Sequence, residues 1–171
     1  DAAEYFQALY GLWGHSWMGG KNDRALALAN EFLSRSQQRS DVNLAMMAHR
    51  IMGSTLLTIG DFQRSAQHFE KTIALSRSKG QQPLHGLYMV EPQVASLLLA
   101  SWDLWFLGYP DQSLAHVSEA LSLAHDLAQP YSIAFAHYMT SVVHILRGEP
   151  EHALASAEQS LQLSREQRFS L

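Results

Sequence analysis

Apolar residues recur along this chain at the three- and four-residue spacing of amphipathic α-helices. The stretch after Gly108 shows the pattern, with apolar residues at Leu114, Val117, Leu121 and Ala124. Another apolar helical segment lies ahead of the same glycine. This spacing favours helices with one buried face, and it predicts an all-α protein whose helices are separated by short turns.

Four segments of the chain align beneath one another, and each begins with a glycine. The glycines stand 40, 48 and 40 residues apart, at Gly20, Gly60, Gly108 and Gly148. Five residues later each segment has a small residue, followed by an apolar one; the small residues are Ala25, Ser65, Ser113 and Ala153. A fixed period of this kind is the signature of a repeat architecture. The predicted unit is a helix, a tight turn and a second helix, occurring four times.

Local chemistry explains why the chain turns at these glycines. The residue after a helix often takes the left-handed conformation, which costs residues other than glycine about 1–2 kcal/mol. Pro110 and Pro150 fall in the first turn of the next helix, where the missing N–H of proline is no loss. All four glycines are therefore predicted to end a helix with positive φ.

The first of these turns lies in GHSWMGGKNDRALAL, residues 14–28, and raises the alternative of a phosphate-binding loop. That loop needs a glycine, four further residues and then Gly-Lys-Ser/Thr, all following a strand. Here His15 occupies the place of the first glycine, and Asn22 occupies the place of the magnesium-binding hydroxyl. We therefore interpret Gly19, Gly20 and Lys21 as a bend between two helices.

The aligned positions resemble the tetratricopeptide repeat family. Its pattern combines a small residue in the first helix, a glycine at the turn, and a small and then a bulky residue in the second helix. In the second repeat these are Gly53, Gly60, Ser65 and Phe69. The resemblance implies an α-α superhelix, that is, a TPR-like solenoid, in which residues 1–171 form one array of four repeats. The repeats span residues 6–39, 46–79, 94–127 and 134–167. Trp13 stands where the first repeat should have its small residue, and it predicts that this repeat is a distorted cap.

A longer connection, residues 80–93, interrupts the array after the second repeat. It contains Leu84, Leu87, Tyr88 and Met89, and this apolar content predicts that it folds back over the array. Repeats of this long period are similar to the helical arms of large bacterial signalling proteins. In those proteins a class III adenylate cyclase domain and a P-loop ATPase domain precede the arm; the arm of the maltose-regulon activator is a more distant relative. The resemblance implies a cytoplasmic regulatory arm cut from a longer protein.

Composition narrows the function further. Hydrophobic residues make up 47% and charged residues 16% of the chain, which is typical of a folded domain, and the net charge of −4 argues against nucleic acid or an acidic membrane as partner. The chain has no cysteine and no apolar stretch long enough to span a bilayer. Histidines are common metal ligands, and the candidates here are His49, His137 and His144. No carboxylate at helical spacing completes a ligand set with them. Without a catalytic motif, we expect no cofactor, no metal and no enzyme activity.

The family resemblance also implies a candidate binding surface. In tetratricopeptide repeats the first helix of each repeat lines the concave face of the superhelix. Carried across by register, that face holds aromatic residues and an arginine: Tyr10, Trp17, Arg50, Trp102, Trp105, Phe135 and Tyr138. Large apolar patches on a surface usually mark interaction sites. Two interpretations stay open, a groove that binds a partner, and a face closed by its own side chains or by a neighbouring repeat.

The first interpretation predicts a protein-interaction module whose partner is an apolar or aromatic peptide segment, or a neighbouring domain of the same chain. The face lacks the lysines and asparagines with which some relatives clamp a terminal carboxylate, so a chaperone tail is not expected. The alternative function is a sensor arm. In it, the aromatic side chains enclose a small apolar effector and regulate a linked ATPase or adenylate cyclase domain.

Overall fold

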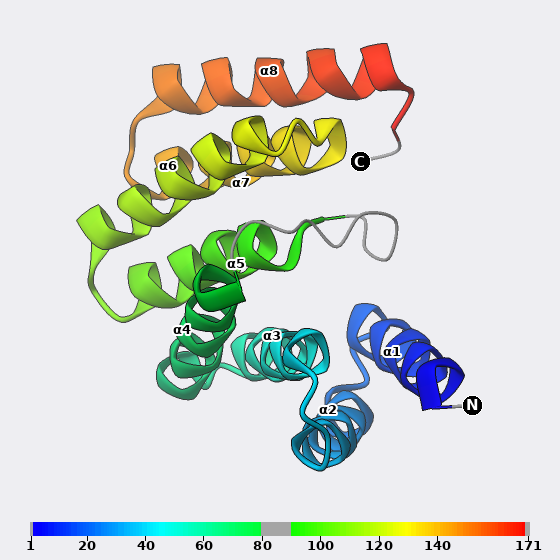
Figure 1. The fold of residues 1–171 in the computed structure, drawn as a ribbon. Coiled ribbons are helices and arrows are strands. Elements are labelled where there is room, and N and C mark those ends of the chain that lie inside the picture. The colour runs from blue at the N-terminus through cyan, green and yellow to red at the C-terminus, as the bar shows by residue number, and fades with distance from the viewer. Residues whose placement is uncertain (1, 80–89, 170–171) are drawn as a thin grey trace. The chain divides into compact units, whose positions relative to one another are not determined.

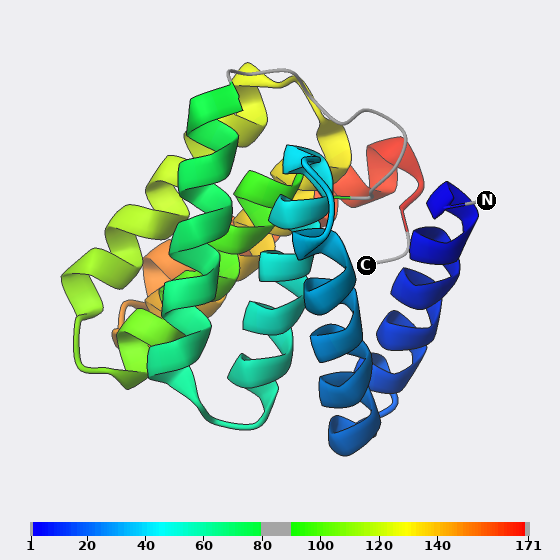
Figure 2. The same ribbon diagram turned by 60° about the horizontal axis from the view of Figure 1, so that its bottom comes forward.

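The computed structural model describes residues 2–79 and 90–169, in which the helices form four antiparallel pairs (Figures 1 and 2). They are α1 (Ala2–Met18), α2 (Asn22–Gln37), α3 (Val42–Thr58), α4 (Phe62–Lys79), α5 (Pro92–Phe106), α6 (Pro110–Asp126), α7 (Pro130–Leu146) and α8 (Pro150–Gln167). These two ranges contain no strand, which confirms the predicted all-α, TPR-like fold of helix-turn-helix repeats. No helix in them is long and apolar enough to cross a bilayer. Residues 80–89, with Leu84, Leu87, Tyr88 and Met89 of the predicted loop, lie outside the described residues.

The chain divides into two compact units, Asp1–Lys79 and Gly80–Leu171, which we call the N-terminal unit and the C-terminal unit. In the N-terminal unit, α1 pairs with α2, α3 pairs with α4, and α3 packs against α2. In the C-terminal unit, α5 pairs with α6, α7 pairs with α8, and α7 packs against both α5 and α6. Each unit is therefore built from two stacked helical hairpins. The joining of all four repeats into one array stays a prediction.

All four predicted turns place their glycine in the left-handed region. The φ angle is 67° at Gly20, 83° at Gly60, 87° at Gly108 and 73° at Gly148. At the first turn the Gly20 N–H donates to the Trp17 carbonyl at 3.1 Å, and the Lys21 N–H donates to the Ser16 carbonyl at 2.9 Å. These bonds satisfy carbonyls that the end of α1 leaves without helical partners. Lys21 thus belongs to a bend between α1 and α2, as the sequence predicts.

The connection between α6 and α7 makes the same turn without a glycine. Ala128 has a φ of 50°, and its N–H donates to the His125 carbonyl at 2.9 Å. Alanine pays the steric cost of this conformation, about 1–2 kcal/mol, which glycine avoids. Pro130 then occupies the first position of α7. All four helices of the C-terminal unit begin with proline in this way.

In the second pair, the missing side chain of a glycine on α3 makes room for an aromatic ring on α4. Gly53 is buried, and a Cβ placed on it would stand 2.8 Å from the Phe69 ring, closer than real contacts allow. The Ser65 hydroxyl donates to the Gly53 carbonyl at 2.9 Å and ties the helices together beside that contact. Gly53, Ser65 and Phe69, three of the four residues that carry the family resemblance in this repeat, therefore form one packing layer.

In the first pair, the sizes of the residues at the same register positions are exchanged. Trp13 stands at the register position of Gly53, and Ala29 stands at the position of Phe69; both are buried. α1 runs without interruption through Trp13. The helix itself is regular at Trp13, and the interpretation of the first repeat as a distorted cap stays a prediction.

A side-chain hydrogen bond also repeats with the register. The Thr72 hydroxyl donates to the Met46 carbonyl at 3.2 Å in the second pair, and the Ser160 hydroxyl donates to the Ala134 carbonyl at 2.8 Å in the fourth. Each bond satisfies a buried hydroxyl and links the two helices of its pair. The second and fourth pairs are thus held at corresponding points.

Candidate functional site

The predicted residues of the N-terminal unit form one cluster between α1 and α3. The Trp13 and Trp17 rings stack with their centroids 5.3 Å apart, and the Tyr10 ring lies 5.7 Å from that of Trp13. The Arg50 guanidinium is 5.7 Å from the Tyr10 centroid and 5.9 Å from the Trp13 centroid, and its Nη2 donates to the Tyr10 hydroxyl at 3.0 Å. Sequence reasoning missed Trp13 as a member. Its four-residue spacing from Trp17 on one helix was the signal available.

This cluster is largely occupied with internal packing. Trp13 is buried, and its Nε1 donates to the buried Thr55 hydroxyl at 2.9 Å. Trp17 Nε1 donates to the Ser54 carbonyl at 3.1 Å. Buried indole N–H groups need such partners, and these two fasten α1 to α3. The cation–π contacts of Arg50 add to the same joint.

The C-terminal unit presents apolar side chains to solvent on two contacting helices, α5 and α7. They form what we call the α5–α7 face: Trp105, Phe106, Tyr138, Ile145 and Leu146. Trp105 is half-buried and the other four are exposed, with 64% of Ile145 accessible to solvent. Trp105 and Phe106 take the same register positions as Ile145 and Leu146 in the next repeat. The face is therefore a repeated feature of both helices.

The other two predicted residues of the C-terminal unit, Trp102 on α5 and Phe135 on α7, are half-buried. Phe135 and Tyr138, both on α7, have ring centroids 6.1 Å apart. Trp102 is half-buried on α5, and its Nε1 is enclosed without a hydrogen-bond partner. An unpaired buried donor costs about 1–3 kcal/mol. Trp102 therefore belongs partly to the core, whereas Tyr138 is open to solvent.

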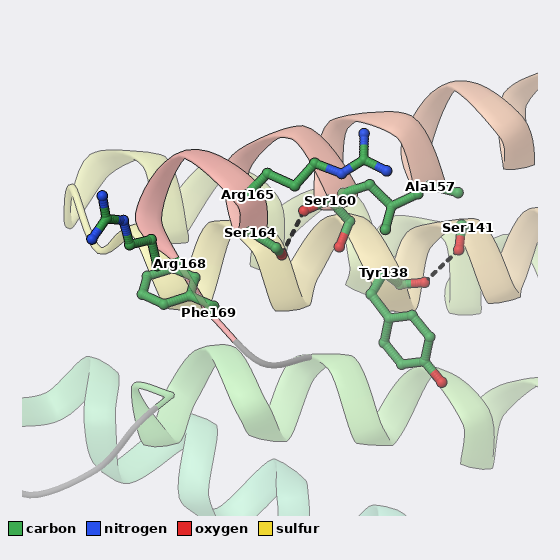
Figure 3. Close-up of a pocket in the computed structure, with 9 residues that line it drawn as sticks. Tyr138, Ser141, Ala157, Ser160, Ser164, Arg165, Arg168 and Phe169 are labelled. Carbon is green, nitrogen blue, oxygen red and sulfur yellow. Dashed lines mark hydrogen bonds between the residues drawn. The ribbon is translucent and has the colours of Figure 1, made fainter.

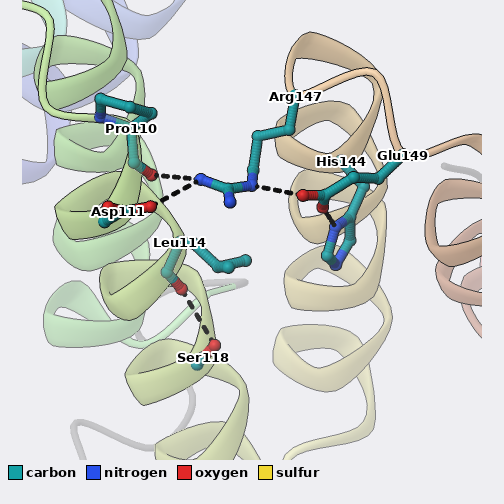
Figure 4. Close-up of polar contacts among 7 residues, drawn as sticks. All are labelled: Pro110, Asp111, Leu114, Ser118, His144, Arg147 and Glu149. Atoms are coloured by element: carbon teal, nitrogen blue, oxygen red, sulfur yellow. Dashed lines mark hydrogen bonds and ion pairs between the residues drawn. The ribbon is translucent and has the colours of Figure 1, made fainter.

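An ion-pair network fixes the turn that follows α7 (Figure 4). Arg147 Nε donates to Glu149 Oε1 at 2.9 Å, while its Nη1 donates to the Pro110 carbonyl at 3.1 Å and to Asp111 Oδ1 at 3.2 Å. His144 Nδ1 lies 2.7 Å from Glu149 Oε2. The hydrogen bonds from His144 and Arg147 lower the pKa of Glu149 and keep its carboxyl ionised at neutral pH. The network joins the start of α6 to the turn after α7.

Two histidines face each other across the second pair. The Nδ1 atoms of His49 and His68 are 2.9 Å apart. Burial is the main cause that lowers both pKa values, that of His68 to about 4, and the charge of Lys71 acts in the same direction. Both rings are therefore neutral at pH 7, and one ring donates to the other. Within residues 2–79 and 90–169, no three metal-ligating side chains come together.

A hollow of about 460 Å³ opens between α7 and α8 (Figure 3). Tyr138, Ala157 and Leu161 line it with apolar groups, and Arg165 and Arg168 lie at its α8 end. The serine hydroxyls around it are turned back to helix carbonyls, with Ser141 donating to Tyr138, Ser160 to Ala134 and Ser164 to Ser160 at 2.7–2.8 Å. The surface offered by the hollow is therefore mainly apolar with a cationic end.

Comparison with solved structures identifies the fold. The chain superposes on the Rap protein complexed with Competence and Sporulation Factor with a TM-score of 0.80 at 14% identity, covering 94% of this chain and 43% of Rap. It superposes on BtubC (BKLC) from P. vanneervenii with a TM-score of 0.71 at 16% identity, covering 92% of this chain and 61% of BtubC. For MamA the TM-score is 0.60 at 13% identity, and the superposition covers 95% of this chain and 80% of MamA. These are TPR-type helical repeat proteins, and the similarity shows a fold of that type.

The chain thus spans less than two thirds of both Rap and BtubC. No family model matches the sequence, and no curated protein matches it.

Proposed function

We propose that this chain is a non-catalytic TPR-type interaction module that binds an apolar or aromatic protein segment on its α5–α7 face. The observation that carries the proposal is the exposure of Phe106, Tyr138, Ile145 and Leu146 on two adjacent helices. Such apolar side chains favour burial by about 25 cal/mol per Å² of surface removed from water.

The proposal gives the two groups of predicted residues different roles. Tyr10, Trp17 and Arg50 are tied to one another and to α3, so they stabilise the N-terminal unit. Trp105 and Tyr138 combine a large ring with a polar atom, and residues of this kind dominate the energetics of protein interfaces. A partner would bury them against α5 and α7. The ion-pair network of Arg147 holds the end of α7 in place for that contact.

The structural comparison supports binding as the general role. Rap, whose fold is similar, was solved in complex with Competence and Sporulation Factor. A helical-repeat scaffold of this type therefore carries a bound factor in at least one case. For the present chain we propose a segment of another protein, or a neighbouring domain of the same chain, as the partner.

Selection from a random-peptide phage library tests the proposal. We expect the protein to enrich peptides rich in aromatic and aliphatic residues. Ile145→Glu should weaken a selected peptide at least about tenfold, because it places a charge in the centre of an apolar contact. Leu154→Glu is the matched control, since Leu154 on α8 is 61% exposed against 64% for Ile145.

Circular dichroism should show the same melting temperature for both variants and the wild type, because both side chains are exposed. Equal peptide binding by the two variants would contradict the proposed face. Failure of the library to enrich any peptide would contradict peptide binding itself.

A sensor of small apolar effectors, regulating a linked ATPase or adenylate cyclase domain, is the second candidate. The hollow between α7 and α8 favours it, because its volume of about 460 Å³ lies within the usual range of small-molecule pockets. Native mass spectrometry of the purified protein tests this candidate by looking for a retained ligand. Loss of that ligand in Ala157→Phe, which fills the hollow, would support the sensor; a ligand-free spectrum would count against it.

A further inference from the structure

Charge is divided unevenly between the two units. The N-terminal unit has nine lysines and arginines against seven aspartates and glutamates, so its net charge is +2. The C-terminal unit has three of the first kind against nine of the second, so its net charge is −6. Together these values give the −4 of the whole chain. The unit that presents the α5–α7 face is therefore acidic, and its field attracts cationic partners.

Acidic residues stand at one end of that face in both repeats. Phe106 is the last residue of α5, and Asp111 follows it by five positions; Leu146 is the last residue of α7, and Glu151 follows it by five positions. Both acidic residues lie in the first turn of the next helix, α6 or α8, which pairs with α5 or α7. Each hairpin thus has an apolar and an acidic residue at the same end.

The carboxylates at this end are accessible to a partner. The Asp111 side chain is 93% exposed, and Arg147 Nη1 contacts one of its oxygens, Oδ1, at 3.2 Å (Figure 4). Glu151 is exposed as well. Residues 107–111 and 147–151 contain three acidic residues and one basic residue, Arg147, which also pairs with Glu149. The turns beside the face therefore keep a negative charge after that pairing.

The two helices of the face add no opposing charge. Neither α5 nor α7 contains a lysine or an arginine. A cationic side chain on the face would therefore meet no like charge from these helices. The ends of α5 and α7 at Phe106 and Leu146 are also the negative ends of their helix dipoles. Both conditions favour a cation over an anion at this end of the face.

We propose that the segment bound on the α5–α7 face is cationic as well as apolar, with lysine or arginine next to its apolar residues and close to Asp111 and Glu151. This inference rests on the proposed function and adds the chemical class of its ligand. The apolar contact provides most of the affinity, because exposed ion pairs contribute little individually. The charges select among apolar segments, since complementary charge speeds association and like charge repels.

Two synthetic peptides test the proposal. They share one core of leucine and tryptophan, which is flanked by lysines in the first peptide and by glutamates in the second. Fluorescence anisotropy at low salt should show that the lysine peptide binds the protein at least about tenfold more tightly. The difference should shrink at about 0.5 M salt, where the Debye length falls below about 5 Å. Ile145→Gln should weaken both peptides, because Ile145 belongs to the apolar face.

Charge variants with matched controls locate the preference. Glu151→Lys should weaken the lysine peptide about fivefold and strengthen the glutamate peptide. Glu166→Lys is the control, since it makes the same charge change at an exposed position of the same helix. It lies 15 residues further along α8, about 22 Å away, which exceeds the Debye length of about 8 Å at physiological salt. Asp111→Asn and Asp126→Asn repeat the comparison on α6, and circular dichroism should show that all four variants fold.

The outcomes separate this inference from the proposed function. Equal affinity for the two peptides, or tighter binding of the glutamate peptide, would overturn the charge preference and leave the binding face in place. Equal effects of Glu151→Lys and Glu166→Lys would also overturn it, because the preference would then follow from net charge alone. Binding of neither peptide, or binding that Ile145→Gln leaves unchanged, would contradict the proposed face itself.

Discussion

The two units of this protein contain the same helical hairpins and use their aromatic residues in opposite ways. In the N-terminal unit, Trp13 and Trp17 donate their indole N–H groups to α3, and Arg50 lies over the rings of that cluster. In the C-terminal unit, Phe106 and Tyr138 stand in solvent on adjacent helices. Tyr10 and Tyr138 take the same register position, yet Tyr10 accepts a hydrogen bond from Arg50 and Tyr138 is exposed. Aromatic residues at equivalent places of a repeat therefore do not share an environment. Whether a ring is packed or exposed depends on the groups that the neighbouring helix places beside it.

The largest effect expected from this difference follows truncation of Trp13. Trp13→Ala removes a buried ring and leaves the Thr55 hydroxyl without its indole donor, so it should lower the free energy of unfolding by about 3–5 kcal/mol. The exposed Tyr138→Ala should cost less than about 1 kcal/mol. Urea denaturation followed by circular dichroism measures both. Equal losses would mean that the two units do not differ in the way described.

Two glycines in the N-terminal unit test how tightly its hairpins pack. Gly53→Ala brings a Cβ to 2.8 Å from the Phe69 ring and should destabilise the protein by about 1–3 kcal/mol. Gly14→Ala meets no atom within 4 Å and should stabilise α1 by up to about 1 kcal/mol, because alanine favours helix over glycine. Thermal melting should therefore shift in opposite directions. Identical shifts would show that α3 and α4 yield more easily than the geometry suggests.

Two turns of the C-terminal unit should respond with opposite signs to exchange of the turn residue. Gly108→Val forces a branched side chain to φ of 87° and should cost about 1–2 kcal/mol. Ala128→Gly relieves the strain of the same conformation at φ of 50° and should raise stability. The gain should not exceed about 1 kcal/mol, because the higher entropy of glycine in the unfolded chain offsets part of it. Equilibrium denaturation of each single variant measures the pair. A destabilising Ala128→Gly would show that the alanine methyl contributes packing that outweighs its backbone strain.

The glycine turns illustrate what a sequence reveals directly. A positive φ is a property of a single residue, so a glycine in the sequence is enough to predict it, as at Gly20. Ala128 makes the same turn, but alanine does not indicate a positive φ. Only Pro130, two residues later, indicates that a helix begins there. The place of Trp13 in the cluster could not be predicted for a different reason. Its partner Thr55 lies on another helix, and such a contact can be recognised only when facing positions are considered together.

The candidate face could be predicted less completely than the fold. The family register places Trp17 and Tyr138 on corresponding surfaces, but it does not determine the partners of their polar atoms. The hydrogen bond from Trp17 to Ser54 depends on how α1 meets α3. The Arg147 network likewise joins residues 36 positions apart, from the start of α6 to the turn after α7. Such contacts arise from the packing of separate segments, which periodicity alone does not encode.

The smallest predicted effect concerns acid and the histidine pair of the N-terminal unit. Burial lowers the pKa of His68 from 6.5 to about 4, so the unfolded chain binds more protons than the folded one between these values. Stability should therefore be lost as the pH falls from 6.5 towards 4. The full shift corresponds to about 3 kcal/mol, and solvent screening of this half-buried ring reduces it to about 1 kcal/mol.

Denaturation of the wild type and of His68→Gln across this pH range measures the effect, and the variant should show a shallower decline. The pKa of His137, in the C-terminal unit, is also lowered by burial, so some decline should remain. If the stability of the variant falls as steeply as that of the wild type, groups other than His68 cause the loss of stability in acid.

The exchange of sizes between Trp13 with Ala29 and Gly53 with Phe69 has a consequence for how such a protein can be recombined. A chimera that put α4 behind α1 would set tryptophan against phenylalanine, and one that put α2 behind α3 would set glycine against alanine. The first interface would be overfilled and the second would contain a void. The smallest transferable module is therefore the hairpin, and duplication or shuffling of single helices would break the fold that whole-hairpin exchange preserves.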